Sequence, residues 1–240
     1  MGNRPASPLF NITQTYYLNY KMNTLLKKLI VLGFSLSALA TLHGALIVET
    51  GAGGTYITPV DMTEINPVNG ASFPPGSIKF KPGAMFFISP GFEQGRYKLT
   101  LDFNFSKSDV KSIGLLGNGH PQQAGTGSLY IITAMPTVSY TLLQGDSLSW
   151  NISGGAGVSR INSVHIGVRG GTDWSTAWDT EFSFKLGSAL KYDLSSKLAL
   201  SLGLNFVQTD KTKLNTNSAT QLDFRKIEQT QFYLSATYKL

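Results

Sequence analysis

The chain of 240 residues contains no cysteine. It can therefore form neither disulfides nor thiolate metal sites, and it has no thiol nucleophile. Charged residues are also scarce, at 14% of the chain, whereas glycine is frequent, with 25 residues. Low charge together with abundant glycine favours a β-rich fold with many turns over a helical one.

Acidic residues are absent from the first 45 positions, which hold the basic residues Arg4, Lys21, Lys27 and Lys28. The rest of the chain therefore carries 16 basic and 14 acidic side chains, although the whole chain has a net charge of +6. Because most of the excess positive charge lies in this N-terminal segment, we do not expect nucleic acid as a partner.

A long apolar run occurs at residues 29–39, after Lys27 and Lys28 and before the small residue Ala40. The run is shorter than the ~20 residues of a membrane-spanning helix. It predicts a secretory signal peptide over residues 22–45, cleaved near 40 or 45, with an N-terminal anchor helix as the alternative. Residues 1–21 are expected to be a non-native or mis-assigned extension. After the signal, no apolar run is long enough for a second membrane helix.

The segment "RYKLTLDFNF" (96–105) alternates between polar and apolar residues at every position. Such alternation indicates a β-strand with two unlike faces. Similar period-two segments recur along the chain and predict eight strands, at 46–58, 80–92, 96–105, 128–142, 147–159, 180–192, 197–207 and 231–240. The parity of the fifth segment continues through Val164, Ile166 and Val168, so this strand is expected to extend further.

The connections between these segments alternate strictly between long and short. This pattern predicts an all-β, eight-stranded, antiparallel up-and-down transmembrane β-barrel over residues 46–240. Ten residues tilted by ~45° rise about 23 Å, close to the ~25 Å apolar band of such barrels. Pro136 lies at the centre of the fourth segment, where it removes a donor from the ladder, and so predicts a bulge or local break.

Two kinds of barrel fit the alternation. A membrane barrel turns its Leu and Phe face toward lipid, whereas a soluble lipocalin-like barrel would turn that face inward. The other face should then be rich in Lys, Glu and Thr, yet it is rich in small residues such as Gly51, Gly155, Ser183 and Gly203. Small residues suit the crowded interior of an eight-stranded barrel. The apolar face is therefore predicted to contact lipid, in a bacterial outer membrane.

Ten charged residues have the parity of the lumen and predict a lumenal charge network: Glu49, Lys79, Lys81, Arg96, Lys98, Asp102, Glu181, Lys185, Lys191 and Lys239. If the last strand closes on the first, Glu49 and Lys239 meet at the periplasmic end and are expected to form an ion pair. The network either stabilises the barrel only or lines a conduction path, which eight strands would leave narrow or gated.

The segments "ISGGAGVSRI", "FKLGSALKYDLSSKLALSLGLNF" and the terminal "FYLSATYKL" resemble the barrel domain shared by opacity-type and OmpA-like outer-membrane proteins. The resemblance covers nearly all of 46–240, but its motifs are diffuse. It implies a C-terminal signal for the barrel-assembly machinery. The residues that would form this signal are Phe232, Leu234, Tyr238 and Leu240, where Leu240 replaces the usual terminal Phe.

Catalytic and ligand-binding motifs are weak in this sequence. Ser163, His165 and Glu181 resemble the Ser/His/acid set of lipid A-modifying barrels, but the H-x-S-N run of the deacylases is absent. The glycine clusters at 51–54 and 154–157 are followed by no G-K-[ST], so close strand packing explains them better than phosphate binding. We expect no enzyme activity, cofactor or metal.

The predicted long loops form the remaining functional surface. Recognition residues are expected on one of them, at Arg169, Asp173, Trp174, Trp178 and Asp179, with Lys211, Lys213 and Arg225 on another. The prediction is a monomeric structural or adhesion protein, in contact with outer-membrane lipid and lipopolysaccharide and with a possible host or surface ligand. The alternative is a narrow porin for small or hydrophobic solutes, similar to OmpW. A lipid A-modifying enzyme is the distant third.

Overall fold

A computed structural model describes residues 44–65, 76–115, 123–168, 173–174, 178–215 and 221–240. The predicted extension 1–21 and nearly all of the predicted signal 22–45 lie outside these ranges. The strands belong to one compact unit, Ala45–Leu240. Among the described residues, no helix is long and apolar enough to cross a bilayer.

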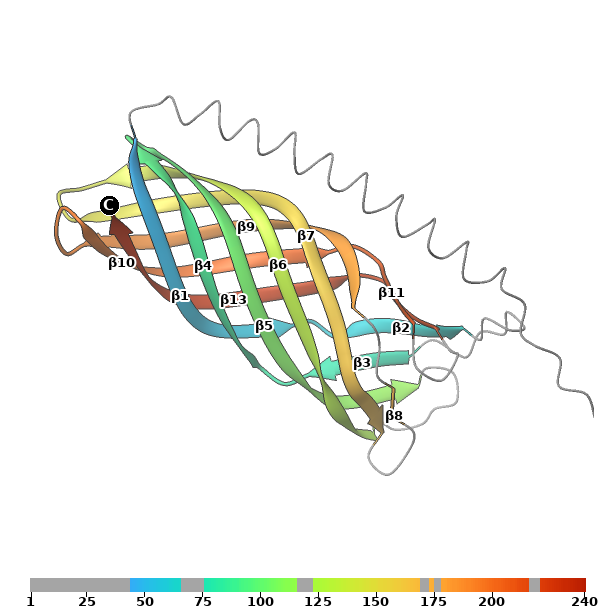
Figure 1. Cartoon of the computed structure of the whole chain (residues 1–240). Coiled ribbons are helices and arrows are strands. Elements are labelled where there is room, and N and C mark those ends of the chain that lie inside the picture. Colours follow the sequence, from blue (N-terminus) through green and yellow to red (C-terminus); the bar gives the residue numbers. More distant parts are fainter. Residues whose placement is uncertain (1–43, 66–75, 116–122, 169–172, 175–177, 216–220) are drawn as a thin grey trace, which may run out of the picture. The chain divides into compact units, whose positions relative to one another are not determined.

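Eight long strands form the ring of the barrel (Figure 1): β1 (Ala45–Ile57), β4 (Gly83–Gln94), β5 (Tyr97–Leu115), β6 (Gln123–Gln144), β7 (Leu148–Val168), β9 (Asp179–Asp193), β10 (Leu198–Thr209) and β13 (Ile227–Lys239). Each ring strand pairs antiparallel with its two neighbours, and β1 closes on β13. The short turns β4–β5, β6–β7 and β9–β10 lie at the same end as both termini of the unit, where the Leu240 amide donates to the Leu46 carbonyl (2.9 Å). This is the periplasmic end.

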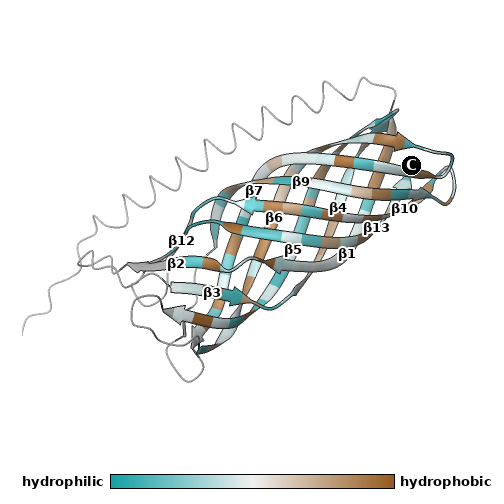
Figure 2. Cartoon of the chain, turned by 180° about the vertical axis from the view of Figure 1, so that it is seen from behind, coloured by the Kyte–Doolittle hydropathy of each residue, from teal (hydrophilic) through white to brown (hydrophobic). Residues whose placement is uncertain are grey.

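Hydrophobic and hydrophilic residues alternate along the ring strands (Figure 2), and their side chains lie on two different faces of the wall. Along β10, Leu200, Leu202 and Leu204 are exposed on the outside, whereas Ser201 and Asn205 are buried in the lumen. Tyrosines and a tryptophan form an outward-facing girdle near the periplasmic end, at Tyr97, Tyr140, Trp150, Tyr192 and Tyr238. Exposure of so many large apolar side chains fits lipid as the surrounding solvent. The predicted eight-stranded transmembrane barrel is thus confirmed.

Five short strands lie where the sequence predicted long loops: β2 (Val60–Ile65), β3 (Gly76–Phe80), β8 (Asp173–Trp174), β11 (Thr212–Asn215) and β12 (Gln221–Phe224). Strands β11, β12, β2 and β3 pair in that order and join the outer half of β5. They repeat the neighbour order β10, β13, β1, β4 of the ring, so they continue the wall beyond it. We call these four strands and the outer parts of β5, β6 and β7 the extracellular extension.

The predicted bulge at Pro136 is wrong, but the predicted local break is present on one side, because the β6–β7 pairs skip Met135 and Pro136. Pro136 is the register partner of Leu101, and the β6–β7 register is the same on both sides of it, from Ala134 with Val158 to Thr137 with Gly155. The β6–β7 register instead shifts near both ends of the pair, between Thr126 and Ser128 and between Thr141 and Leu143. The proline, which cannot donate to the ladder, therefore interrupts the pairing with β7 locally without causing a bulge.

The predicted extension of the fifth strand is confirmed, because β7 continues to Val168, but the alternation between its two faces reverses before that end. His165 has a φ of 52°, opposite Gly127 with a φ of 97°. Left-handed backbone at this pair accompanies the register shift and reverses the alternation of β7. Ile166, expected on the lipid side, is therefore fully buried.

Candidate functional site: the barrel lumen and the outer rim

Charged side chains cluster at the periplasmic mouth of the lumen. Glu93 on β4 accepts from Lys191 on β9 and from Lys239 on β13, each at 3.0 Å. Lys191 also lies 3.5 Å from Asp193. The predicted pair between Glu49 and Lys239 is therefore wrong, because Lys239 lies beside Ile47, nearer the mouth than Glu49, and its ammonium pairs with Glu93 instead.

Glu49 lies deeper in the lumen and has other partners. Its carboxylate accepts from the Lys98 ammonium (2.6 Å) and from the Ser235 hydroxyl (2.6 Å). These groups come from β1, β5 and β13. Ser235 lies on the strand next to β1, and Lys98 lies on β5, which only β4 separates from β1. A short ion pair with a further hydrogen bond therefore links these strands along one side of the lumen.

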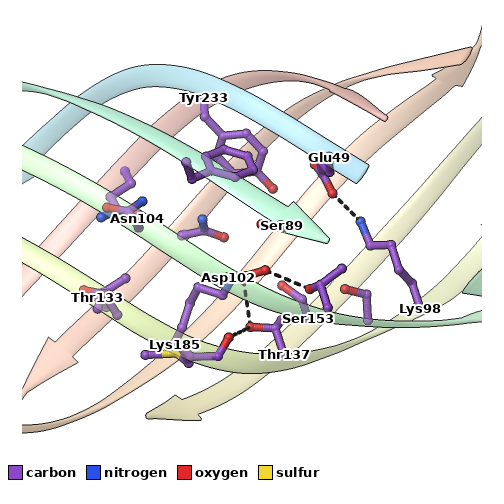
Figure 3. Close-up of a pocket in the computed structure, with 17 residues that line it drawn as sticks. Glu49, Ser89, Lys98, Asp102, Asn104, Thr133, Thr137, Ser153, Lys185 and Tyr233 are labelled. Atoms are coloured by element: carbon purple, nitrogen blue, oxygen red, sulfur yellow. Dashed lines mark hydrogen bonds and ion pairs between the residues drawn. The ribbon is translucent and has the colours of Figure 1, made fainter. Parts of the chain in front are cut away.

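Asp102 is the centre of the next layer (Figure 3). It forms an ion pair with Lys185, and it accepts from the hydroxyls of Thr100 (2.8 Å) and Thr137 (2.7 Å). The side chains of Asp102 and Lys185 are only 12% and 13% exposed. With three donors, the buried carboxylate is well compensated for its loss of water.

A small cavity of about 50 Å³ lies beside these groups, bounded also by Phe87 and Tyr233. Each water needs about 10–15 Å³ of such volume, so the cavity holds about four waters and no larger solute. The Phe87 and Tyr233 rings meet edge to face, with centroids 5.2 Å apart, and narrow the lumen further. This part of the lumen is therefore a filled interior rather than an open pore.

The outer end of the lumen is closed by apolar side chains, which we call the apolar cap. They come from ring strands and from the extension, and each is at most 5% exposed: Ile57, Val60, Ile78, Phe80, Val110, Ile113, Leu129, Ile131, Ile161, Ile166, Phe224 and Ile227. The sequence analysis missed this cap. A signal was present, since Leu129, Ile131 and Ile161 have the parity of the lumen despite being apolar.

Three of the predicted lumenal charges lie elsewhere. Lys79 alternates with the buried Ile78 and Phe80 of β3, so it lies on the outer face. Lys81 is exposed in the connection that follows β3, and Arg96 is exposed in the β4–β5 turn. Their assignment to the lumen was wrong, because the predicted strands ran through a bend and a turn where the parity ends.

The other predicted lumenal charges, Glu49, Lys98, Asp102, Lys185, Lys191 and Lys239, all make the lumenal contacts described above. Glu181 is half-buried and shares the lumenal face of β9 with the fully buried Ser183. Glu93 was not predicted. It is the last inward-facing residue of β4, whereas the predicted strand ended at residue 92.

The predicted recognition residues lie around the β7–β9 connection. Arg169 lies outside the described residues. Asp173 and Trp174 make up the short strand β8, which pairs with β7. Trp178 is 42% exposed, and the Arg160 guanidinium lies 5.4 Å from its ring centroid. Asp179 accepts from the Thr180 amide (2.8 Å). Of the second predicted group, Lys211 and Arg225 are exposed, and Lys213 is in β11.

The weak catalytic set does not share one face. Ser163 is fully buried, whereas His165 is exposed on the left-handed backbone of β7. The predicted assembly-signal residues all face lipid, with exposures of 60% for Phe232, 66% for Leu234, 46% for Tyr238 and 69% for Leu240.

Comparison with known proteins identifies the fold. No protein-family model matches the chain, and no curated protein matches it in sequence. The structure is similar to outer membrane protein OprG from Pseudomonas aeruginosa, with 13% identity, a TM-score of 0.54, and coverage of 82% of this chain and 98% of OprG. Neisserial surface protein A (12% identity, TM-score 0.46, coverage 81% and 97%) and AlkL (18%, 0.45, 82% and 90%) also match.

The closed ring, its lipid-facing band and this likeness define the class. The chain has the fold of the small eight-stranded outer-membrane β-barrels, and its exposed apolar band fits insertion in such a membrane.

Proposed function

We propose that this protein is a closed barrel whose functional surface is the extracellular extension, in a structural or adhesion role, and that it is not a solute channel. One observation carries the proposal: the lumen is closed at successive heights by ion pairs, aromatic rings and the apolar cap. A cavity with room for about four waters leaves no solute path among the described residues.

The extension supports the recognition role. Strands β5, β6 and β7 contain 19, 22 and 21 residues, about twice what is needed to cross the apolar band. Their outer halves and the added strands form a paired sheet above the membrane. A rigid sheet is a better platform for binding residues than free loops, because less conformational entropy is lost on binding.

A conductance measurement tests the closed lumen. The refolded full chain is inserted in planar bilayers, with a sixteen-stranded porin as positive control. We expect no steady conductance at low voltage from a barrel that shows heat-modifiable migration on gels. Steady single-channel conductance would refute the proposal and support the second candidate, a narrow path for hydrophobic solutes. The observation behind that candidate is the apolar lining of the outer lumen.

An adherence assay tests the recognition role. Thr55 pairs with Gly83, so a short Gly-rich linker can replace residues 58–82 without removing a β1–β4 ring pair. Bacteria expressing this variant should lose adherence to cultured cell layers and coated surfaces, while the shortened barrel remains folded and heat-modifiable. Equal adherence of the variant and the wild type, or none by the wild type, would contradict the proposed role.

A further inference from the structure

Four lysines gather on the outer face of β3 and β5. Lys79 is the register neighbour of Ser112, next to Lys111, and the Lys81 amide donates to the Asp109 carbonyl (2.8 Å). Lys107 and Lys111 lie on the outside of β5, on either side of Asp109. We call Lys79, Lys81, Lys107 and Lys111 the lysine patch.

The patch begins at the outer edge of the apolar band. The outward-facing apolar residues of β5 run from Tyr97 to Phe105. At about 2.3 Å of height per tilted residue, Lys107 lies roughly 23 Å above Tyr97, against a band of ~25 Å. Tyr130 beside it marks the outer interface, with the Lys107 ammonium 5.8 Å from its ring centroid. The patch therefore faces sideways at the height of the headgroups of the outer leaflet.

The four positive charges are poorly balanced. Asp109 lies among them, 3.4 Å from Lys107, and no other acidic group forms an ion pair with the patch among the residues whose side chains the structure describes. Asp109 lies beyond the apolar band, and its pKa is held below its ordinary range by a hydrogen bond from Ser128 (2.7 Å) and by the charges of Lys107 and Lys81. One carboxylate against four lysines leaves an excess of three positive charges.

The neighbouring part of the rim provides a contrast. Arg225 lies 4.0 Å from Asp61, and Lys226 lies 2.6 Å from Glu228. Lys211 is next to Asp210 in sequence, and both border the same open depression. Three cations meet three anions there, so that section is close to neutral. The excess positive charge is a property of the lysine patch and not of the whole rim.

We propose that the lysine patch binds the phosphate groups of lipopolysaccharide in the outer leaflet. Lysines act as flexible point charges that donate hydrogen bonds to phosphate oxygens, while their apolar stems rest on the wall above the lipid band. The lysine patch would supply the contact with lipopolysaccharide that was expected from the sequence. The proposal depends on the position of the barrel in the membrane and not on its proposed role in recognition.

Native mass spectrometry of the full chain, released from phosphatidylcholine nanodiscs containing lipid A, tests the proposal. The test variant is Lys81→Gln/Lys107→Gln/Lys111→Gln, and the matched control is Lys211→Gln/Arg225→Gln/Lys226→Gln from the neutral section. All six side chains are exposed, so both variants should fold and show heat-modifiable migration. The lipids compared are bisphosphorylated, monophosphorylated and phosphate-free lipid A.

Wild type and control should retain bisphosphorylated lipid A best and the phosphate-free form least. The test variant should bind the bisphosphorylated form more weakly by roughly fivefold for each lysine replaced, the factor to which about 1 kcal/mol corresponds. Equal retention by the test variant and the control, or equal retention of all three lipids, would overturn the proposal. Complete displacement of the lipid by soluble pyrophosphate would overturn it too, since the site would then recognise free phosphate. A conducting wild type would leave these expectations unchanged.

Discussion

Replacing Lys185 by methionine should destabilise the barrel, because it leaves the Asp102 carboxylate in the lumen without its cation. The two side chains are 13% and 12% exposed, so little bulk water reaches them. Removing one partner of a buried pair costs about 3–5 kcal/mol. The adjacent cavity of about 50 Å³ can admit a few waters, and the hydroxyls of Thr100 and Thr137 still donate. We therefore expect a loss of about 2–3 kcal/mol.

Urea unfolding of the protein refolded in lipid vesicles, followed by tryptophan fluorescence, measures this loss. The double variant Asp102→Asn/Lys185→Met should recover most of the stability, because it buries no net charge. Lys226→Met is the matched control, since its pair with Glu228 lies at the surface, where the lysine is 57% exposed; it should cost less than about 1 kcal/mol. A Lys185→Met loss no larger than that of the control, or a double variant no more stable than the single one, would refute the reasoning.

Two further predictions concern strand β1. Gly53→Val should destabilise the barrel by about 1–3 kcal/mol, because its side chain would collide with the backbone of β13. Gly54→Val should be nearly neutral in the same urea assay, because the nearest atom to its Cβ would be the Gly83 carbonyl oxygen, at an ordinary contact distance of 3.8 Å; equal effects would contradict the packing argument. In double-mutant cycles, Glu49→Gln should couple to Lys98→Met by about 1 kcal/mol or more and to Lys239→Met by nearly zero. A stronger coupling of Glu49 to Lys239 than to Lys98 would instead support the Glu49–Lys239 ion pair expected from the sequence.

Strand number, order and the face toward lipid could be predicted from the sequence because each depends on local alternation. Leu200, Leu202 and Leu204 cannot turn inward unless Ser201 and Asn205 turn outward. The face on which one residue lies therefore fixes the face of every other residue of the strand. The parity argument failed where the backbone departs from a regular strand. At His165 one left-handed residue reverses the alternation, and at Lys81 and Arg96 the strand has ended.

The sequence by itself thus determined an eight-stranded barrel in a membrane, because the two-residue period of a strand is a local property that can be read in one dimension. Only the tertiary structure decided the partners across the lumen: Glu93 with Lys191 and Lys239, and Asp102 with Lys185. It also decided that the outer strands continue as a sheet over an apolar cap and that four lysines gather on the outer face of this sheet. These features depend on strand tilt and register, which decide which residues of distant strands lie at the same height in the barrel. No local sequence pattern encodes the tilt or the register.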